Sequence, residues 1–165
     1  MAPQKALLFS GTIRENLLWG REDAGEEELY RAAEIACADT FIRQSAQGYD
    51  TRLGQGGVNL SGGQKQRISL ARALVRNPRI LILDDCTSAL DAGTEYEVLR
   101  GLKEMTGRMT VLLVSQRIST VMSADRILCL DGGRVQGYGT HGELMASCRA
   151  YREIYDSQIG GGTNG

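Results

Sequence analysis

Two short strings in this chain have residue types that could hold a phosphate and a divalent cation. In Ser61-Gly62-Gly63-Gln64, a good helix N-cap precedes two glycines, which let backbone N–H groups approach an anion at the positive end of a helix. In Asp84-Asp85, two carboxylates end the apolar run 80–83. Carboxylate oxygens are the ligands that Mg²⁺ prefers. The two strings together predict a Mg-nucleotide site, although each alone also fits a capped helix or a strand end.

Short apolar runs that alternate with helical patterns predict the elements that position this site. Strands are expected over 80–83, 109–115 and 126–130, and Asn77-Pro78 ends the helix before the first of them. This order indicates an α/β fold with a parallel sheet, whose strands present ligand-binding residues at their carboxyl ends. Since adjacent strand residues point to opposite faces, the two carboxylates of Asp84-Asp85 are expected to do different jobs.

Other local patterns predict the remaining elements. A helix begins at Glu26-Glu27-Glu28 and has an apolar face, and a second helix begins at Asp39 and is ended by Gly48. Residues 131–133 predict a tight hairpin, and Thr140-His141-Gly142-Glu143 has the spacing of a capping box. The apolar face of the first helix consists of Leu29, Ala32, Ala33 and Ala36.

Composition excludes several classes of protein. The chain has 165 residues and a net charge of −1, which gives no electrostatic reason to expect nucleic acid as a partner. Its four cysteines form no CxxC pair, which favours buried thiols over metal ligands or disulfides. The apolar runs are much shorter than the roughly 18 residues of a membrane helix, and no signal peptide is recognisable. The chain itself is therefore expected to be soluble, and a membrane role would come through a partner or another segment.

The string LSGGQKQRISLARAL, residues 60–74, resembles the signature motif and signature helix of the ATP-binding cassette of ABC transporters. The strand ending in Asp84-Asp85 resembles the Walker B motif of that family, and Ser88-Ala89-Leu90-Asp91 resembles its D-loop. The resemblance implies an α/β, partial P-loop NTPase-like ABC ATPase fold with a parallel sheet and an α-helical signature subdomain. It places a partial cassette at 1–159, with that subdomain at 12–77 and the rest of the catalytic core at 78–159. The glycine-rich tail, 160–165, is expected to be disordered.

The resemblance also implies ATP and Mg²⁺ as cofactors and assigns the binding residues. The signature residues Ser61, Gly62, Gly63 and Gln64 would touch the γ-phosphate of ATP held by an opposite cassette. Asp84 would hold Mg²⁺, usually through water. Asp91 would act across the interface between two cassettes, although its type and position also suit an N-cap.

The first residues of the chain are similar to the Q-loop of exporters. Gln4 would contact Mg²⁺ and the attacking water, and the stretch Phe9–Leu17 would meet the intracellular helices of the membrane domains. Without the resemblance, the same residues predict only a strand end and a helix start. The resemblance therefore implies two kinds of partner, a second cassette and the transmembrane domains of an exporter.

Three residues depart from the family pattern. Asp85 stands where the family has a glutamate that positions or deprotonates water, Gln116 stands where it has a switch histidine, and Gln55 stands where exporters have a glutamate in the loop that touches the membrane domains. An aspartate draws its oxygens back by about 1 Å, a displacement that can cost on the order of 100-fold in rate. An amide cannot relay a proton as imidazole does, and the only histidine, His141, is expected to be structural.

These departures resemble the subunit of a heterodimeric exporter whose own ATP site is degenerate and whose intact signature completes the partner's site. Asp85 and Gln116 would then be the weakened catalytic residues. No GxxxxGK[ST] phosphate loop occurs in the sequence, so the chain alone is expected to bind ATP weakly and to lack ATPase activity. Met1 would then be an internal methionine of a longer protein, an interpretation that the sequence permits.

The expected function is the cassette part of an ABC exporter at the cytoplasmic face of the cell membrane. One alternative is a free-standing, non-catalytic interaction module that docks on a complete cassette. A third reading is a chromosome-maintenance or repair ATPase. The string FSGTIRENL at 9–17, typical of exporters, and the lack of coiled-coil heptads argue against that third reading.

Overall fold

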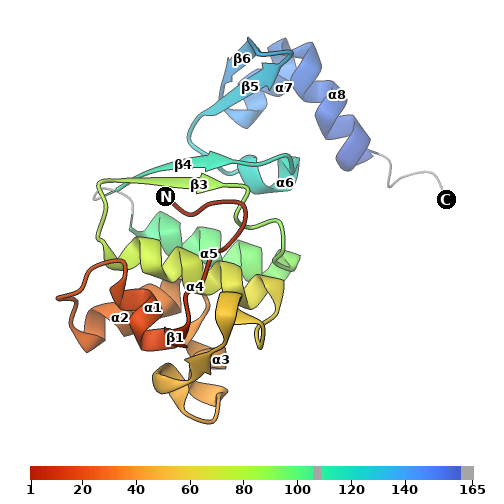
Figure 1. Ribbon diagram of the computed structural model, residues 1–165. Coiled ribbons are helices and arrows are strands. Elements are labelled where there is room, and N and C mark those ends of the chain that lie inside the picture. The colour runs from red at the N-terminus through yellow and green to blue at the C-terminus, as the bar shows by residue number, and fades with distance from the viewer. Residues whose placement is uncertain (106–108, 161–165) are drawn as a thin grey trace. The chain divides into compact units, whose positions relative to one another are not determined.

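The computed structural model of the chain describes residues 1–105 and 109–160 (Figure 1). It consists of two compact units, which divide after Val114. Each unit is described by itself below. The expected division into 12–77 and 78–159 remains a prediction, and residues 161–165 of the expected disordered tail lie outside the described residues.

In the first unit, helices surround the long helix that begins after the glycine-rich string. They are α1 (Ile13–Leu18), α2 (Glu26–Ile35), α3 (Asp39–Gln44), α4 (Gly62–Val75) and α5 (Ala92–Glu104), with the 3₁₀ turns η1 (Gly48–Asp50) and η2 (Gln55–Gly57). Two short strands, β1 (Gly11–Thr12) and β2 (Arg52–Leu53), pair antiparallel. The expected apolar face of α2 is confirmed, because Leu29, Ala32, Ala33 and the following Ala36 are buried.

The end of α3 differs from the sequence expectation. This helix begins at Asp39 as expected but ends at Gln44, because Ser45 adopts extended backbone angles (φ −73°, ψ 154°). Gly48, with φ 54°, instead begins η1. The Ser45 hydroxyl stabilises this turn by donating to the carbonyl of Ile42 at 2.6 Å. The helix therefore ends at a serine whose hydroxyl hydrogen-bonds the local backbone, before Gly48 is reached.

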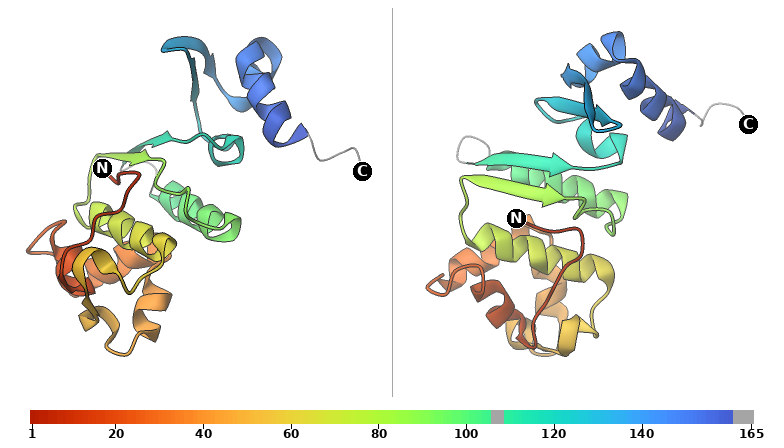
Figure 2. Two further views of the ribbon diagram at one scale, coloured as in Figure 1. Left: turned by 45° about the vertical axis from the view of Figure 1, so that its right-hand side comes forward. Right: turned by 45° about the horizontal axis from the view of Figure 1, so that its top comes forward.

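The expected parallel sheet is confirmed for two strands of the first unit. Strand β3 (Ile80–Asp84) pairs in parallel with β4 (Thr110–Val114), from Ile80 opposite Thr110 to Asp84 opposite Val114. Helices α4 and α5 lie on one side of these strands (Figures 1 and 2). The side chains of Leu81 and Leu83 are fully buried.

The N-terminal residues run beside β3. The N–H of Ala2 donates to the carbonyl of Ile82 at 2.8 Å, and the N–H of Asp84 donates to the carbonyl of Ala2 at 3.0 Å. This short parallel bridge places Gln4 beside the carboxyl end of β3. Residues 80 and 82 positions apart in the sequence are thus joined by backbone hydrogen bonds.

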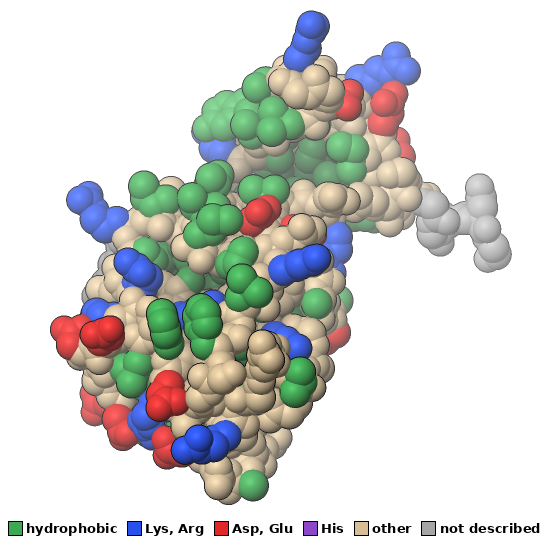
Figure 3. All heavy atoms as spheres, viewed as in Figure 1, with side chains coloured by type: hydrophobic (Ala, Val, Ile, Leu, Met, Phe, Trp, Pro, Cys, Tyr) green, Lys and Arg blue, Asp and Glu red, His purple; other side chains and the backbone are tan. Residues whose placement is uncertain are grey.

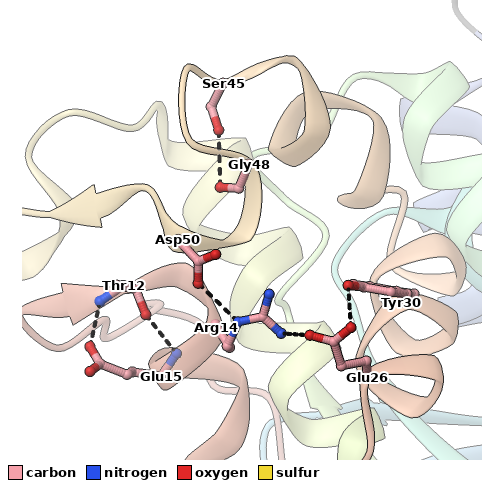
Figure 4. A network of polar contacts seen from close by, with 8 residues as sticks. All are labelled: Thr12, Arg14, Glu15, Glu26, Tyr30, Ser45, Gly48 and Asp50. Atoms are coloured by element: carbon pink, nitrogen blue, oxygen red, sulfur yellow. Dashed lines mark hydrogen bonds and ion pairs between the residues drawn. The ribbon is translucent and has the colours of Figure 1, made fainter.

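A network of charged side chains joins α1 to α2 and η1 (Figure 4). The Arg14 guanidinium bonds Asp50 at 2.9 Å and Glu26 at 2.6 Å, and the Tyr30 hydroxyl donates to Glu26 at 3.0 Å. The hydrogen bond from Arg14 lowers the pKa of Asp50. This network fixes α1, the helix that follows the Q-loop-like segment, against the other helices of its unit.

The second unit contains a hairpin and helices that cover one of its faces. Its elements are α6 (Ile118–Val121), β5 (Ile127–Asp131), β6 (Arg134–Gly139), α7 (His141–Ser147) and α8 (Arg149–Gln158). Gly132 and Gly133 have φ of 54° and 73°, as a tight type I′ turn requires, so the expected hairpin is confirmed. Because β5 pairs antiparallel with β6, it lies outside the parallel sheet to which its apolar run was attributed.

The start of α7 also follows the sequence expectation. Thr140 and Glu143 form the predicted capping box. The His141 ring lies 2.9 Å from the Tyr151 hydroxyl through Nδ1, which is a structural contact within the second unit. The capping box and this contact together hold α7 against α8.

One face of the β5–β6 hairpin is buried and the other is exposed to solvent. Ile127 and Cys129 are buried against α7 and α8, whereas four large apolar side chains on these strands are exposed, and Figure 3 shows apolar side chains gathered there. The exposed residues are Leu128, Leu130, Val135 and Tyr138.

All four cysteines are free and three are buried, and burial raises the pKa of Cys86 to about 11. The expectation of buried thiols is therefore confirmed for all but Cys37, which is half-buried.

Two glycines of the second unit provide a matched test of its packing. A Cβ at Gly137 would lie 2.8 Å from Leu144 Cδ2 and 3.0 Å from Cys148 Sγ, whereas a Cβ at Gly142 would meet nothing within 4 Å. We expect Gly137→Ala to lower the free energy of unfolding by about 1–3 kcal/mol. Gly142→Ala should leave it unchanged or raise it by up to about 1 kcal/mol, because alanine favours a helix. Urea denaturation followed by circular dichroism measures both, and a neutral Gly137→Ala would contradict the packing of β6 on α7.

Candidate functional site

The exposed start of α4 is built by a reciprocal capping box. The Gln64 N–H donates to Ser61 Oγ at 3.2 Å, and the Ser61 N–H donates to Gln64 Oε1 at 3.0 Å. The N-cap role expected of Ser61 is thus confirmed. Because this box engages two backbone donors, the N–H groups of Gly62 and Gly63 remain at the tip of the helix, where the dipole favours an anion.

The second glycine of this turn is also required by packing. A Cβ on Gly63 would lie 3.0 Å from the carbonyl oxygen of Ala89, which is backbone and cannot yield as a flexible side chain can. Ala89 belongs to the segment 85–91 that follows β3, hereafter the 85–91 turn. The start of α4 therefore lies directly against the turn that carries Asp85 and Asp91.

The two carboxylates at the end of β3 have different backbone environments. Asp84 is the last residue of β3, but Asp85 lies outside the strand with φ 44°, in the left-handed region. The expectation that the two point to opposite faces of one strand is therefore wrong at Asp85, because the chain turns there. Its N–H donates to the Val114 carbonyl at 2.9 Å, and its carbonyl accepts from the Ser88 hydroxyl at 2.8 Å. Aspartate tolerates positive φ better than most residues.

Gln4 is brought to the same place from the other end of the chain. Its Nε2 donates to Asp85 Oδ2 at 3.3 Å, a contact between residues 81 positions apart. An amide whose nitrogen faces this carboxylate turns its oxygen, the atom that suits a hard cation, in another direction. The Gln4 amide oxygen and the half-buried Asp84 carboxylate are both hard oxygen donors, the ligand type that suits Mg²⁺.

Asp91 has the cap role that its sequence position suggested. Its Oδ1 accepts from the Thr94 N–H at 2.9 Å and its Oδ2 accepts from the Thr94 hydroxyl at 2.7 Å, so it begins α5. These hydrogen bonds lower the pKa of Asp91 and keep its carboxylate ionised. Its side chain is exposed, so the cap leaves the carboxylate accessible at the end of the 85–91 turn.

The two glutamines that depart from the family pattern are both exposed, and they lie in different units. Gln55 is in η2 of the first unit. Gln116 is in the second unit, where its carbonyl accepts from Gln158 Nε2 at 2.8 Å. The same Gln158 amide accepts the N–H of Ile118 at 2.8 Å. Gln158 thus holds the backbone around Gln116.

Within the first unit, the structure brings together Gln4, Asp84, Asp85, Asp91 and the start of α4. Sequence reasoning missed two supporting residues, Gln66 in the first unit and Gln158, which holds the backbone around Gln116 in the second. Gln66 lay inside the recognised string without a role, and Gln158 lies 42 positions from its partner Gln116 with no local pattern to mark it. The described part of the chain contains no cluster of three or more His, Cys, Asp or Glu side chains placed to hold a metal ion.

Comparison with known proteins decides the family. The family model of ABC transporters matches residues 1–88, which is more than half of the 165 residues. The chain belongs to the ABC transporter family. The matched residues include the Q-loop-like segment, the signature helix and the strand that ends in Asp84.

Individual ABC transporters match nearly the whole chain. The uncharacterized ABC transporter ATP-binding protein YfiB of Bacillus subtilis (strain 168) is 52% identical over 96% of this chain and 27% of its own length. A protein of Staphylococcus aureus (strain NCTC 8325 / PS 47), named for multidrug export as an ATP-binding/permease protein, is 46% identical over 96% of this chain and 27% of its own length. This chain thus spans about a quarter of the length of the curated relatives it matches.

A solved ABC transporter structure has the same fold. It is that of a bacterial Atm1-family ABC exporter with ATP bound, and it is 40% identical with a TM-score of 0.92. The match covers 96% of this chain and 28% of that chain. The expected mixed α/β cassette fold is therefore confirmed. Within residues 1–105 and 109–160, no helix has the length and apolar character needed to cross a membrane.

Proposed function

We propose that this chain is part of the ATP-binding cassette of an exporter and couples ATP binding and hydrolysis to transport across a membrane. The observation that carries the proposal is the assembly around the carboxyl end of β3. There Gln4 contacts Asp85 at 3.3 Å, and the exposed start of α4 packs on the same 85–91 turn. The similarity to an exporter structure with ATP bound, and to a relative named for multidrug export, supports this assignment.

The site residues of this chain have separate proposed roles. Asp84 and the Gln4 amide oxygen would hold Mg²⁺, and the start of α4 would bind the γ-phosphate of ATP on an opposite cassette. When bound, Mg²⁺ neutralises charge that develops on the phosphates. Asp85 would orient water, and the amide of Gln116 would donate a hydrogen bond to phosphate without moving a proton.

The finer part of the proposal concerns asymmetry between two sites. Asp85 is shorter than glutamate and Gln116 cannot relay a proton, whereas Ser61, Gly62, Gly63 and Gln64 are intact. We therefore assign this cassette a slow ATP site of its own and a competent signature for its partner's site. The partners are a different second cassette and the membrane domains, and the cassette lies at the cytoplasmic face of the membrane.

A non-catalytic interaction module is the second candidate. The substitutions at Asp85 and Gln116 favour it, because both weaken the chemistry of the chain's own site while the signature stays intact. The two candidates differ in one measurable respect. The module would complete the partner's ATP site but support no hydrolysis at its own site.

The proposed function predicts hydrolysis that depends on Mg²⁺ and on Asp84. The assembled exporter, purified with its partner cassette and membrane domains in lipid nanodiscs, should hydrolyse ATP, and chelation of Mg²⁺ by EDTA should abolish turnover. Asp84→Asn should lower Mg-ATP affinity at this cassette's site by about 10-fold or more, because it removes the anionic ligand. Isothermal titration of the assembled exporter with Mg²⁺ and a non-hydrolysable ATP analogue measures this affinity.

The matched control is Asp125→Asn, which makes the same change on an exposed carboxylate of the second unit. That variant should bind Mg-ATP as the wild type does. An assembled exporter that neither binds nor hydrolyses Mg-ATP would overturn the proposed function.

A further inference from the structure

Gln66 is a buried amide with both ends in hydrogen bonds to distant backbone. It lies in the second turn of α4, and the residue is 7% exposed. Its Nε2 donates to the carbonyl of Gln4 at 3.0 Å, and its Oε1 accepts from the N–H of Ala89 at 3.3 Å. These partners lie 62 and 23 positions away in the sequence.

The two partners are the backbones of the two segments that carry site residues. Gln4 reaches Asp85 with its own side chain, so the carbonyl held by Gln66 belongs to the residue whose amide contacts that carboxylate. Ala89 belongs to the 85–91 turn, which packs on Gly63 and ends at Asp91, the cap of α5. One side chain on a continuous helix of 14 residues therefore hydrogen-bonds the backbones of both segments.

We infer that Gln66 is a positioning residue that couples Gln4 to the 85–91 turn. When the Q-loop-like segment moves, the Gln4 carbonyl moves with it and displaces the Gln66 side chain that donates to it. That displacement shifts Ala89, which donates to the same amide, and the rest of the turn up to Asp91. The amide is suited to this because it is both donor and acceptor, and because a buried amide that loses one partner leaves a polar group unsatisfied. The functional consequence rests on the proposed function, whereas the mechanical tie itself rests only on the contacts of Gln66.

The two ends of the amide can be separated by substitution. Gln66→Glu keeps an acceptor for the Ala89 N–H but removes the donor to Gln4, and Gln66→Met removes both in a side chain of similar length. Hydrogen exchange of the exporter followed by mass spectrometry should show the Ala89 amide exchanging about 10-fold faster in Gln66→Met, and within about 2-fold of wild type in Gln66→Glu. Unchanged exchange at Ala89 in Gln66→Met would overturn the tie.

The kinetic consequence is tested in the assembled exporter. Gln66→Glu should lower the rate constant of the slow, own-site phase of single-turnover hydrolysis by about 10-fold while the affinity of that site for Mg-ATP changes by less than about 2-fold, because the residue positions groups without touching the nucleotide. The matched control is Gln44→Glu, the same change on an exposed glutamine at the end of α3, and it should leave both constants unchanged.

A double-mutant cycle separates positioning from general destabilisation. In a Gln4→Ala background the effect of Gln66→Glu on the own-site rate constant should fall to about 2-fold, because the side chain that Gln66 positions is already gone. An undiminished 10-fold loss in that background would overturn the inference. If the wild-type exporter hydrolyses no ATP, the proposed function fails, and exchange at Ala89 still tests the tie.

Discussion

Ser61→Arg is expected to reduce the ATP turnover of the assembled exporter by at least about 100-fold. The start of α4 is exposed and keeps the N–H groups of Gly62 and Gly63 at the positive end of the helix. An arginine there fills the approach to this helix end with a long side chain and removes the hydroxyl that caps Gln64. A 100-fold loss corresponds to about 2.7 kcal/mol of transition-state stabilisation, measured as steady-state phosphate release.

The loss of the cap alone is too small to explain such an effect. Replacing an N-cap residue costs about 1 kcal/mol of stability, which leaves the protein folded. The matched control is Ser157→Arg, which places the same side chain on the exposed face of α8 and should leave turnover unchanged. Turnover that persists in a correctly assembled Ser61→Arg exporter would refute the assignment of this helix start to a phosphate.

Asp85→Glu combined with Gln116→His is expected to accelerate hydrolysis at the cassette's own site by on the order of 100-fold. The glutamate restores the reach of about 1 Å that aspartate lacks, and the imidazole can relay a proton. Each change alone should give a smaller gain, because each leaves one group defective. Single-turnover hydrolysis, which resolves a fast and a slow site in one exporter, is the measurement.

The backbone conformation at Asp85 is expected to make this variant less stable than the wild type. At φ 44°, aspartate is tolerated more easily than glutamate, so the variant should lose a few tenths of a kcal/mol to about 1 kcal/mol of stability. The matched control is Asp156→Glu, an exposed carboxylate in α8 that is lengthened by the same methylene and should leave the slow site slow. An own-site rate unchanged by the double substitution would show that something other than these two side chains limits it.

Local chemistry made several parts of the structure predictable. The caps formed by Ser61, Asp91 and Thr140 and the turn at Gly132-Gly133 depend on residues within three or four positions of one another. The strand that ends at Asp84 was readable from its apolar run for the same reason. Such short-range rules fix individual elements without reference to the rest of the chain.

Local sequence patterns could not predict the contacts between residues far apart in the chain. The sequence does not show whether a glutamine is buried or exposed. Nothing in it therefore distinguished Gln66, which bridges Gln4 and Ala89, from Gln44 on the surface. The turn at Asp85 was missed because alternation along a strand was extended one residue too far. Its positive φ follows from hydrogen bonds to Val114 and Ser88, of which the first partner lies 29 positions away.

Single-turnover hydrolysis in the wild-type exporter, with radiolabelled ATP and both cassettes occupied, tests the central claim most directly. The claim is that this cassette has a slow site of its own and completes a fast site on its partner. It predicts two phases of equal size, with about half of the bound ATP hydrolysed on the order of 100-fold more slowly than the rest. A single phase that consumes all bound ATP at one rate would contradict the claim.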